Sequence, residues 1–186
     1  MKVIAIVGSP RANSNSGILA QEVLKSAEAE GAETKIFYAN EMNMVGCQGC
    51  SACKYETDHC VQKDDMTHIY DELNTSDAVV FATPVYMFGM TGQLKLVLDR
   101  LFSYLTSDFL SRMPKGKKLG LIFTQGMPDA EVYSDYFDSV GDILHRLGFN
   151  KPEEIIVGAG LGAPGLAAKE EALLESARSL GKRLAT

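Results

Sequence analysis

A short apolar run near the start of the chain, followed at once by a polar loop, restricts the possible fold more than any other feature. The run covers residues 3–7, and the loop covers residues 8–17 with the sequence GSPRANSNSG. Apolar residues then recur at helical spacing over residues 18–27. This order predicts a buried strand, a tight loop and a helix N-terminus. The first turn of a helix has unpaired N–H groups and a positive dipole end, so the loop is a candidate anion site.

The loop is also rich in side-chain donors. They are the hydroxyls of Ser9, Ser14 and Ser16, the amides of Asn13 and Asn15, and the guanidinium of Arg11. Ordinary helix capping explains Ser and Asn at such a position equally well, so the loop alone leaves both interpretations open. It matches neither GxxxxGK[ST] nor GxGxxG, which disfavours a nucleoside triphosphate or a Rossmann-bound dinucleotide. The terminal phosphate of flavin mononucleotide (FMN) suits such a loop better.

Length and charge exclude several classes of protein. The 186 residues contain no linker or repeat, and we expect one domain over residues 1–186. The net charge of −6 without a basic block argues against a nucleic-acid partner. No apolar run approaches the roughly 20 residues that span a bilayer, so we expect no membrane partner. The sequence passes from Met1 and Lys2 directly into the first strand, which predicts a cytoplasmic protein.

The rest of the chain alternates between buried strands and amphipathic helices. Further strands are expected at residues 34–38, 77–83, 119–124 and 154–157, the second helix is expected to open at residues 63–66, and the last helix to cover 166–184. Five strands alternating with five helices predict an α/β fold with a doubly wound parallel sheet and strand order 2-1-3-4-5. Ligands of such sheets bind beyond the carboxyl ends of the strands. The loops after the first, third and fourth strands should therefore converge there.

All four cysteines lie in one irregular segment, a cysteine-rich loop at about residues 46–62. Cys47, Cys50, Cys53 and Cys60 are separated by two, two and six residues. Thiolates bind soft metals, and two-residue spacings turn successive sulfurs toward one centre, as in bacterial ferredoxins. The segment is too long for a passive turn. Three interpretations stay open: a [4Fe-4S] cluster, structural zinc, or bare thiols kept reduced in the cytoplasm.

Taken together, these motifs resemble the NADPH-dependent FMN reductase superfamily of flavodoxin-like proteins, and within it the iron-sulfur flavoproteins. The likeness rests on residues 8–11 with 15–16, the cysteine motif with 63–66, residues 83–86, and residues 92–95 with 99–100. It implies that FMN is held by the first loop and by the loop after the third strand. The expected cofactor contacts are Ser9, Arg11, Asn13, Asn15, Ser16, Pro84, Tyr86, Met87, Phe88, Gly89, Thr124, Gln125 and Gly126. The expected cluster ligands are Cys47, Cys50, Cys53 and Cys60, although relatives without a cluster can carry a similar loop.

The resemblance implies an oxidoreductase that takes electrons from NAD(P)H and passes them through FMN to a small acceptor, such as a flavin, quinone, azo or nitro compound. An alternative is an electron carrier in which ferredoxin reduces a [4Fe-4S] cluster and the cluster reduces FMN. A third possibility, a zinc-stabilised interaction module, leaves the first loop unexplained. No catalytic residue is assigned, because the cofactor carries the chemistry and no catalytic triad or carboxylate pair is evident.

Three further expectations concern details of the chain. Proteins of this kind are usually homodimers or homotetramers, and we expect the same here. Asp99 and Arg100 fall in the last turn of a helix, which predicts a surface pair or a subunit contact. Met87 and Phe88 stand where more polar residues are usual in similar proteins, which predicts an apolar flavin-ring site.

Overall fold

The chain folds around a sheet of five parallel strands, and the computed structural model describes all residues 1–186. The strands are β1 (Lys2–Val7), β2 (Glu33–Tyr38), β3 (Ala78–Tyr86), β5 (Lys118–Thr124) and β6 (Pro152–Gly158). They pair in the order β2-β1-β3-β5-β6, which confirms the order 2-1-3-4-5 expected for five parallel strands. A two-residue strand, β4 (Gly89–Met90), pairs antiparallel with β3 and was not expected.

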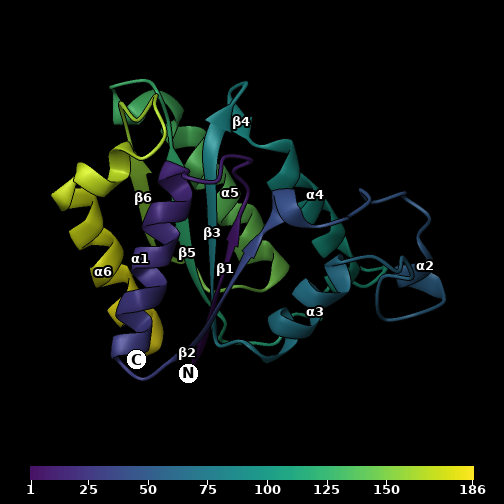
Figure 1. Ribbon diagram of the computed structural model, residues 1–186. Coiled ribbons are helices and arrows are strands. Elements are labelled where there is room, and N and C mark those ends of the chain that lie inside the picture. Colours follow the sequence, from purple (N-terminus) through teal and green to yellow (C-terminus); the bar gives the residue numbers. More distant parts are fainter.

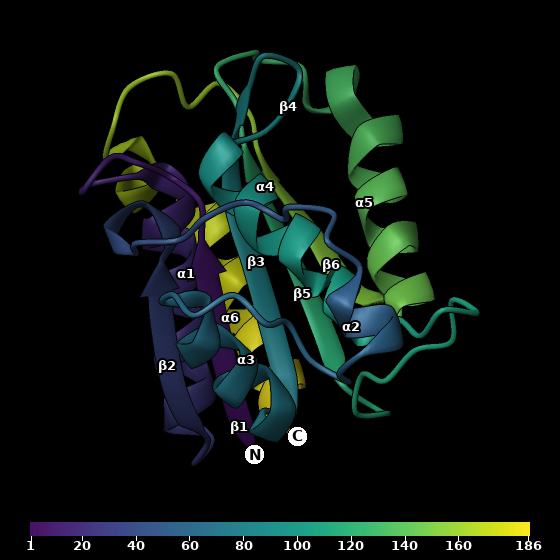
Figure 2. The same ribbon diagram turned by 90° about the vertical axis from the view of Figure 1, so that its right-hand side faces the viewer.

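Helices cover both faces of the sheet (Figures 1 and 2). α1 (Asn15–Ala29) and α6 (Glu171–Ala185) lie on one face, and α3 (Met66–Thr75), α4 (Gly92–Arg100) and α5 (Ser134–Leu147) lie on the other. The alternation of side chains along β1 fits this arrangement. Val3, Ala5 and Val7 pack into the cluster formed with α1 and α6, whereas Ile4 and Ile6 pack into the cluster formed with the other three helices.

Short helical segments complete the fold and change two of the expected boundaries. They are η1 (Ala39–Glu41), α2 (Ala52–Tyr55), η2 (Leu101–Tyr104), η3 (Ala130–Tyr133) and η4 (Leu166–Lys169). The last helix is divided into η4 and α6 instead of running unbroken over residues 166–184. The second helix begins at Met66 instead of residue 63, and the Asp64 carboxylate before it accepts from the Met66 N–H at 3.2 Å and pairs with Arg100.

The loops that follow β1, β3, β5 and β6 meet at the carboxyl edge of the sheet, at the top of Figure 1. Gly8, directly after β1, packs so closely against the start of α4 that an added Cβ would lie 2.6 Å from the Cβ of Leu94. The Thr91 hydroxyl donates to the Gly8 carbonyl at 2.7 Å. A residue larger than Gly would therefore push the first loop away from α4. None of the helices combines the length and apolar character needed to cross a membrane.

Candidate functional site

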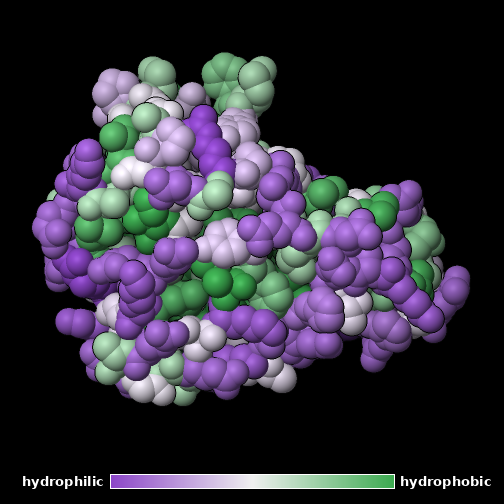
Figure 3. All heavy atoms as spheres, in the orientation of Figure 1, coloured by the Kyte–Doolittle hydropathy of each residue, from purple (hydrophilic) through white to green (hydrophobic).

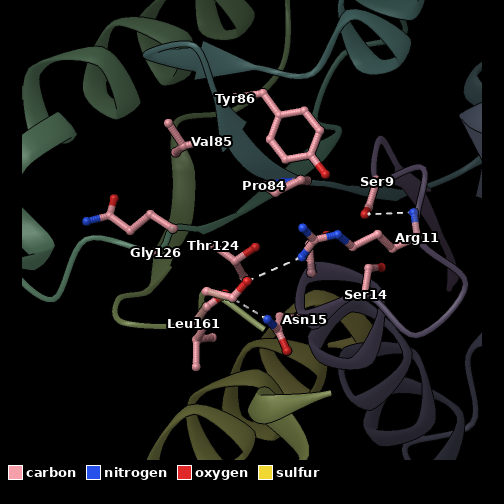
Figure 4. A pocket seen from close by; sticks show the side chains of 13 residues that line it. Ser9, Arg11, Ser14, Asn15, Pro84, Val85, Tyr86, Thr124, Gly126 and Leu161 are labelled. Carbon is pink, nitrogen blue, oxygen red and sulfur yellow. Dashed lines mark hydrogen bonds between the residues drawn. The ribbon is translucent and has the colours of Figure 1, made fainter. Parts of the chain in front are cut away.

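A mostly polar cleft of about 170 Å³ lies where these loops converge (Figure 4). Its lining comes from the ends of four strands and from the first turn of α1. The lining residues are Ser9, Arg11, Ser14, Asn15, Ser16, Pro84, Val85, Tyr86, Thr124, Gln125, Gly126, Leu161 and Gly162. The convergence expected from strand order is therefore present in the structure.

The start of α1 presents unpaired donors to this cleft. Ser14 is the N-cap, and its hydroxyl oxygen accepts from the Gly17 N–H at 3.1 Å, while its carbonyl accepts from the Ile18 N–H. The N–H groups of Asn15 and Ser16 remain without partners in the chain. The Ser16 hydroxyl is fully buried, lines the cleft and makes no hydrogen bond. A buried unpaired polar group costs free energy, so this arrangement favours an anionic ligand.

Two side chains connect the first loop to residues 161–167 after β6. The Arg11 guanidinium extends across the cleft and donates to the Gly162 carbonyl at 3.4 Å (Figure 4). The buried Asn15 amide donates to the carbonyls of Leu161 and Ala163, at 3.0 and 2.8 Å, and its oxygen accepts from the Ala167 N–H at 3.0 Å. The Asn15 side chain therefore links the first loop to the segment after β6. Because all of its polar side-chain atoms are engaged, an anion contact from Asn15 would come from its backbone N–H.

The loop after β5 forms the opposite wall. The Gln125 side chain is buried, and its amide donates to the Asp129 carbonyl at 2.7 Å, but its oxygen has no hydrogen-bond partner. The backbone of Gln125 bonds to Gly158 and Leu161, which fixes this loop against the one after β6. The Gln125 oxygen is therefore free to accept a hydrogen bond from a ligand.

The structure brings most of the expected cofactor contacts into the cleft. Those that line it are Ser9, Arg11, Asn15, Ser16, Pro84, Tyr86, Thr124, Gln125 and Gly126. Those that do not line it are Asn13, Met87, Phe88 and Gly89. Asn13 is exposed on the outer side of the loop, near Gly165. Lining residues outside the expected set are Ser14, Val85, Leu161 and Gly162. Leu161 and Gly162 belong to the glycine-rich stretch at 158–165, directly after the last strand. That position is the sequence signal by which these two residues could have been predicted.

Met87 and Phe88 form the tip of a two-residue hairpin instead of a wall of the cleft. Both have positive φ angles, 45° and 68°, and they are 90% and 73% exposed. A hairpin turn of this length requires positive φ at both positions, and residues without glycine's freedom are strained there. The hairpin is held by the Tyr136 hydroxyl, which accepts from the Met90 N–H at 2.9 Å. It projects as an apolar tip at the top of Figure 3.

A second pocket is lined by all four cysteines. Its other lining residues are Gln48, Gly49, Ser51, Val61, Gln62, Arg100, Phe102 and Ser103. The cysteines are free thiols, and no three His, Cys, Asp or Glu side chains are drawn together as ligands of a single metal ion. Arg112 fixes the loop by donating to the Cys53 carbonyl at 2.8 Å, and Lys54 donates to the carbonyls of Phe102 and Leu105.

Arg100 closes the cysteine segment at its base. It is 1% exposed, so the expectation of a surface pair at this position is wrong. Its Nη1 donates to the Val45 carbonyl and to the Asp64 carboxylate, both at 2.7 Å, and Asp64 accepts from the Val45 N–H at 2.9 Å. Burial acts to raise the pKa of Asp64, but the hydrogen bonds from Arg100 and Val45 outweigh it and lower the pKa. This stabilisation is present at neutral pH and is lost as the pH falls through that lowered pKa.

The two pockets share no residue and lie at opposite ends of α4. The N-cap of this helix, Thr91, is bonded to Gly8 beside the polar cleft, whereas its last residue, Arg100, lines the cysteine pocket. The nine residues of α4 extend about 13 Å at 1.5 Å per residue. The cysteine segment lies beside α3 and α4 (Figure 1), not next to the cleft at the carboxyl edge as its position after β2 suggested.

Comparison with known proteins identifies the family. The model of the NADPH-dependent FMN reductase family matches residues 1–132. An iron-sulfur flavoprotein of Methanocaldococcus jannaschii is 32% identical over the whole chain and 96% of its own length. One of Archaeoglobus fulgidus is 32% identical over the whole chain and 79% of its length. The chain therefore belongs to the NADPH-dependent FMN reductase family, and it is an FMN-dependent oxidoreductase.

Solved structures agree on the fold. An NAD(P)H:quinone oxidoreductase from Methanothermobacter marburgensis has a TM-score of 0.79 at 16% identity, and the match covers all of this chain and 98% of that one. An FMN-dependent NADH-azoreductase from Bacillus anthracis, in complex with FMN, has a TM-score of 0.75 at 14% identity, covering all of this chain and 99% of that one. The flavodoxin-like fold expected from the sequence is confirmed.

The role of Asn15 can be tested by one isosteric change. In Asn15→Asp, a carboxylate would face the carbonyl oxygens of Leu161 and Ala163 and could not donate to either. Each buried group left unpaired costs about 1–3 kcal/mol, so we expect the free energy of unfolding of FMN-free protein to fall by about 2–4 kcal/mol. Amide exchange at residues 161–167 should accelerate. Asn13→Asp, the same change at an exposed neighbour, should shift stability by less than about 0.5 kcal/mol. Equal stability of the two variants would contradict the role assigned to Asn15.

Proposed function

We propose that the polar cleft binds FMN by its terminal phosphate, at the N-terminus of α1. The observation that carries this proposal is the buried, unpartnered Ser16 hydroxyl beside the free N–H groups of Asn15 and Ser16. Ser9 and Arg11 supply a further hydroxyl and a fixed positive charge at the same wall. Donors of this kind, gathered at a helix N-terminus, are complementary to a phosphate dianion.

The flavin ring would extend from this cleft toward the end of β3. The cleft joins the start of α1 to the end of β3, so a ligand anchored at Ser16 could extend along it toward Tyr86. Pro84 and Tyr86 lie on the side toward which the ring would project, and Tyr86 is 38% exposed (Figure 4). Thr124, Gln125 and Gly126 line the other side, where the unpaired Gln125 oxygen could accept from a flavin N–H. Met87, Phe88 and Gly89 would reach the ring only at its outer edge.

The activity that we propose is NAD(P)H-dependent reduction of a small acceptor, such as a flavin, quinone, azo or nitro compound. Bound FMN supplies the chemistry, because it accepts a hydride and passes electrons on singly or in pairs. The chain contributes binding, orientation and a partly open ring site. The exposed apolar tip formed by Met87 and Phe88 lies at the rim of that site, which suits acceptors with apolar ring systems. The homodimer or homotetramer expected from the resemblance stays a prediction.

Removing Arg11 and Ser16 together tests the phosphate site. Hydrogen bonds to a charged group are worth about 1.5–3 kcal/mol each, so the double alanine variant should bind FMN at least about tenfold more weakly. The dissociation constant can be measured by the quenching of flavin fluorescence. Ser139→Ala with Arg146→Ala is a matched control, because it makes the same changes on the exposed face of α5. If the Arg11 and Ser16 variant binds as tightly as this control, the phosphate lies elsewhere.

A second candidate function is specifically favoured by the cysteine pocket. We propose that Cys47, Cys50, Cys53 and Cys60 ligate a [4Fe-4S] cluster that takes electrons from ferredoxin and passes them to FMN. Support comes from the convergence of all four cysteines on one pocket and from the names of the relatives in Methanocaldococcus and Archaeoglobus. A cubane cluster holds its thiolates farther apart than a single ion does. The four thiols lie around one pocket without forming a compact ion site, which is compatible with the wider spacing that a cluster requires.

The surroundings of the cysteine pocket also fit an anionic cluster. Arg100 lines the pocket. Lys54 belongs to the cysteine-rich loop and donates to the Phe102 carbonyl, and Arg112 donates to the Cys53 carbonyl of that loop. A cluster with four thiolate ligands has a net negative charge, which these cations would offset. The pocket itself is small, about 20 Å³, so the four thiolates would have to move outward around a cluster. The loop can accommodate that movement, because Cys47 and Cys50 are exposed and outside regular secondary structure.

Anaerobic purification with analysis of iron and electron donors separates the two candidates. A cluster protein should contain close to four iron and four acid-labile sulfide atoms per chain, as the cluster formula requires. Its FMN should be reduced by ferredoxin faster than by NADH or NADPH. The reductase should instead oxidise NADH or NADPH at steady state without iron. Protein that stays free of iron after anaerobic reconstitution would overturn the cluster, and protein inert to both pyridine nucleotides would overturn the reductase.

A further inference from the structure

The buried Arg100 has one donor that the protein itself does not use. Its two terminal nitrogens bond to the Val45 carbonyl and to the Asp64 carboxylate, with Nη2 to Asp64 Oδ1 at 3.2 Å. Its Nε–H, by contrast, is buried and has no hydrogen-bond partner. Leaving a charged donor buried and unpaired is costly. The Asp64 pair accounts for the burial of the guanidinium but leaves this atom unexplained.

The pocket that Arg100 lines limits which acceptors are available to this nitrogen. Arg100 and the four cysteines line the same pocket, and the other lining residues offer no carboxylate. The side-chain acceptors with a negative charge that this pocket can supply are therefore the cysteine sulfurs. Burial lowers the pKa of Arg100, and the larger effects of Asp64 and Tyr70, with a smaller one from Cys60, raise it. The Tyr70 hydroxyl donates to the Arg100 carbonyl at 2.8 Å and does not line this pocket, whereas Cys60 does.

We infer that the Nε–H of Arg100 donates a hydrogen bond to a sulfur of the iron-sulfur cluster in the cysteine pocket, and that this bond raises the reduction potential of the cluster. This inference rests on the second candidate function, because it requires a cluster at Cys47, Cys50, Cys53 and Cys60. A reduced cluster has one more negative charge than an oxidised one. A donor to its sulfurs therefore stabilises the reduced form more, and hydrogen bonds to sulfur are among the features that set cluster potentials.

Arg100 would then have two separable roles. Its terminal nitrogens hold residues 45 and 64 together, at the two ends of the cysteine segment, by donating to the Val45 carbonyl and to the Asp64 carboxylate. Its Nε–H would act on the cluster itself. The Arg100→Lys substitution removes the Nε–H and keeps a positive charge beside Asp64, with one terminal nitrogen in place of two. The potential of the loaded variant therefore reports on the Nε–H, and its free energy of unfolding reports on the contact with residues 45 and 64.

The test is the midpoint potential of the cluster, measured by redox titration with electron paramagnetic resonance on anaerobically reconstituted protein. In Arg100→Lys, we expect the equilibrium constant for one-electron reduction to fall at least tenfold, which corresponds to a decrease of about 59 mV. Lys95→Arg is the matched control. It exchanges the same two residue types on the exposed face of α4, beside Asp99, and should leave the potential unchanged.

A second measurement uses the unmodified protein, in case Arg100→Lys does not hold a cluster. Protein labelled with ¹⁵N-arginine should show a ¹⁵N coupling in pulsed paramagnetic resonance of the reduced cluster, and Arg112→Lys should retain this coupling. A loaded protein without the coupling, or a loaded Arg100→Lys variant with an unchanged potential, would overturn the inference and leave the cluster intact. Unmodified protein that takes up no iron would overturn the cluster proposal, and the inference with it.

Discussion

The structure depends on one constraint, which is that parallel strands all end at the same edge of the sheet. That edge collects the loops after β1, β3, β5 and β6 and the positive end of α1. Backbone groups at such an edge have no strand partner, so they must find acceptors and donors in neighbouring loops or in a ligand. Asn15 and Gln125 form hydrogen bonds with the backbone of these loops, whereas the Ser16 hydroxyl has no hydrogen-bond partner. The polar cleft is thus a consequence of the topology, and the donors that it offers to a ligand are the groups that remain unpaired.

α4 connects this cleft with the cysteine pocket. Its first turn is fixed to Gly8 by Thr91, and its last residue, Arg100, holds the segment of the cysteines closed against Asp64. A buried ion pair contributes little net stability, but breaking one side of it costs several kcal/mol. The pair therefore determines where the cysteine segment lies more than how stable the fold is.

Much of the fold and of the cleft could be predicted from the sequence, because these features depend on local patterns. Uninterrupted apolar runs identify buried parallel strands, and the strand-loop-helix junction at residues 3–17 predicts the helix N-terminus that lines the cleft. The errors concern interactions between distant residues. Nothing local indicates that the Asn15 amide bonds to residues 161–163, or that Arg100, in the last turn of a surface-like helix, is buried against Asp64. Met87 and Phe88 lie outside the cleft, on a tight hairpin that carried no sequence signal because neither is a residue type that normally adopts positive φ.

The central claim is that the donors at the start of α1 bind a phosphate, and a comparison of two flavins tests it most directly. FMN and riboflavin share the ring and the ribityl chain and differ only in the terminal phosphate. If the cleft supplies two or more charge-assisted hydrogen bonds, the account predicts that FMN binds at least about 100-fold more tightly than riboflavin at the same ionic strength. Fluorescence titration of FMN-free protein with each flavin gives both dissociation constants. Equal affinity for the two flavins would contradict the account, because the donors at Ser16 and Arg11 would then have no phosphate to bind.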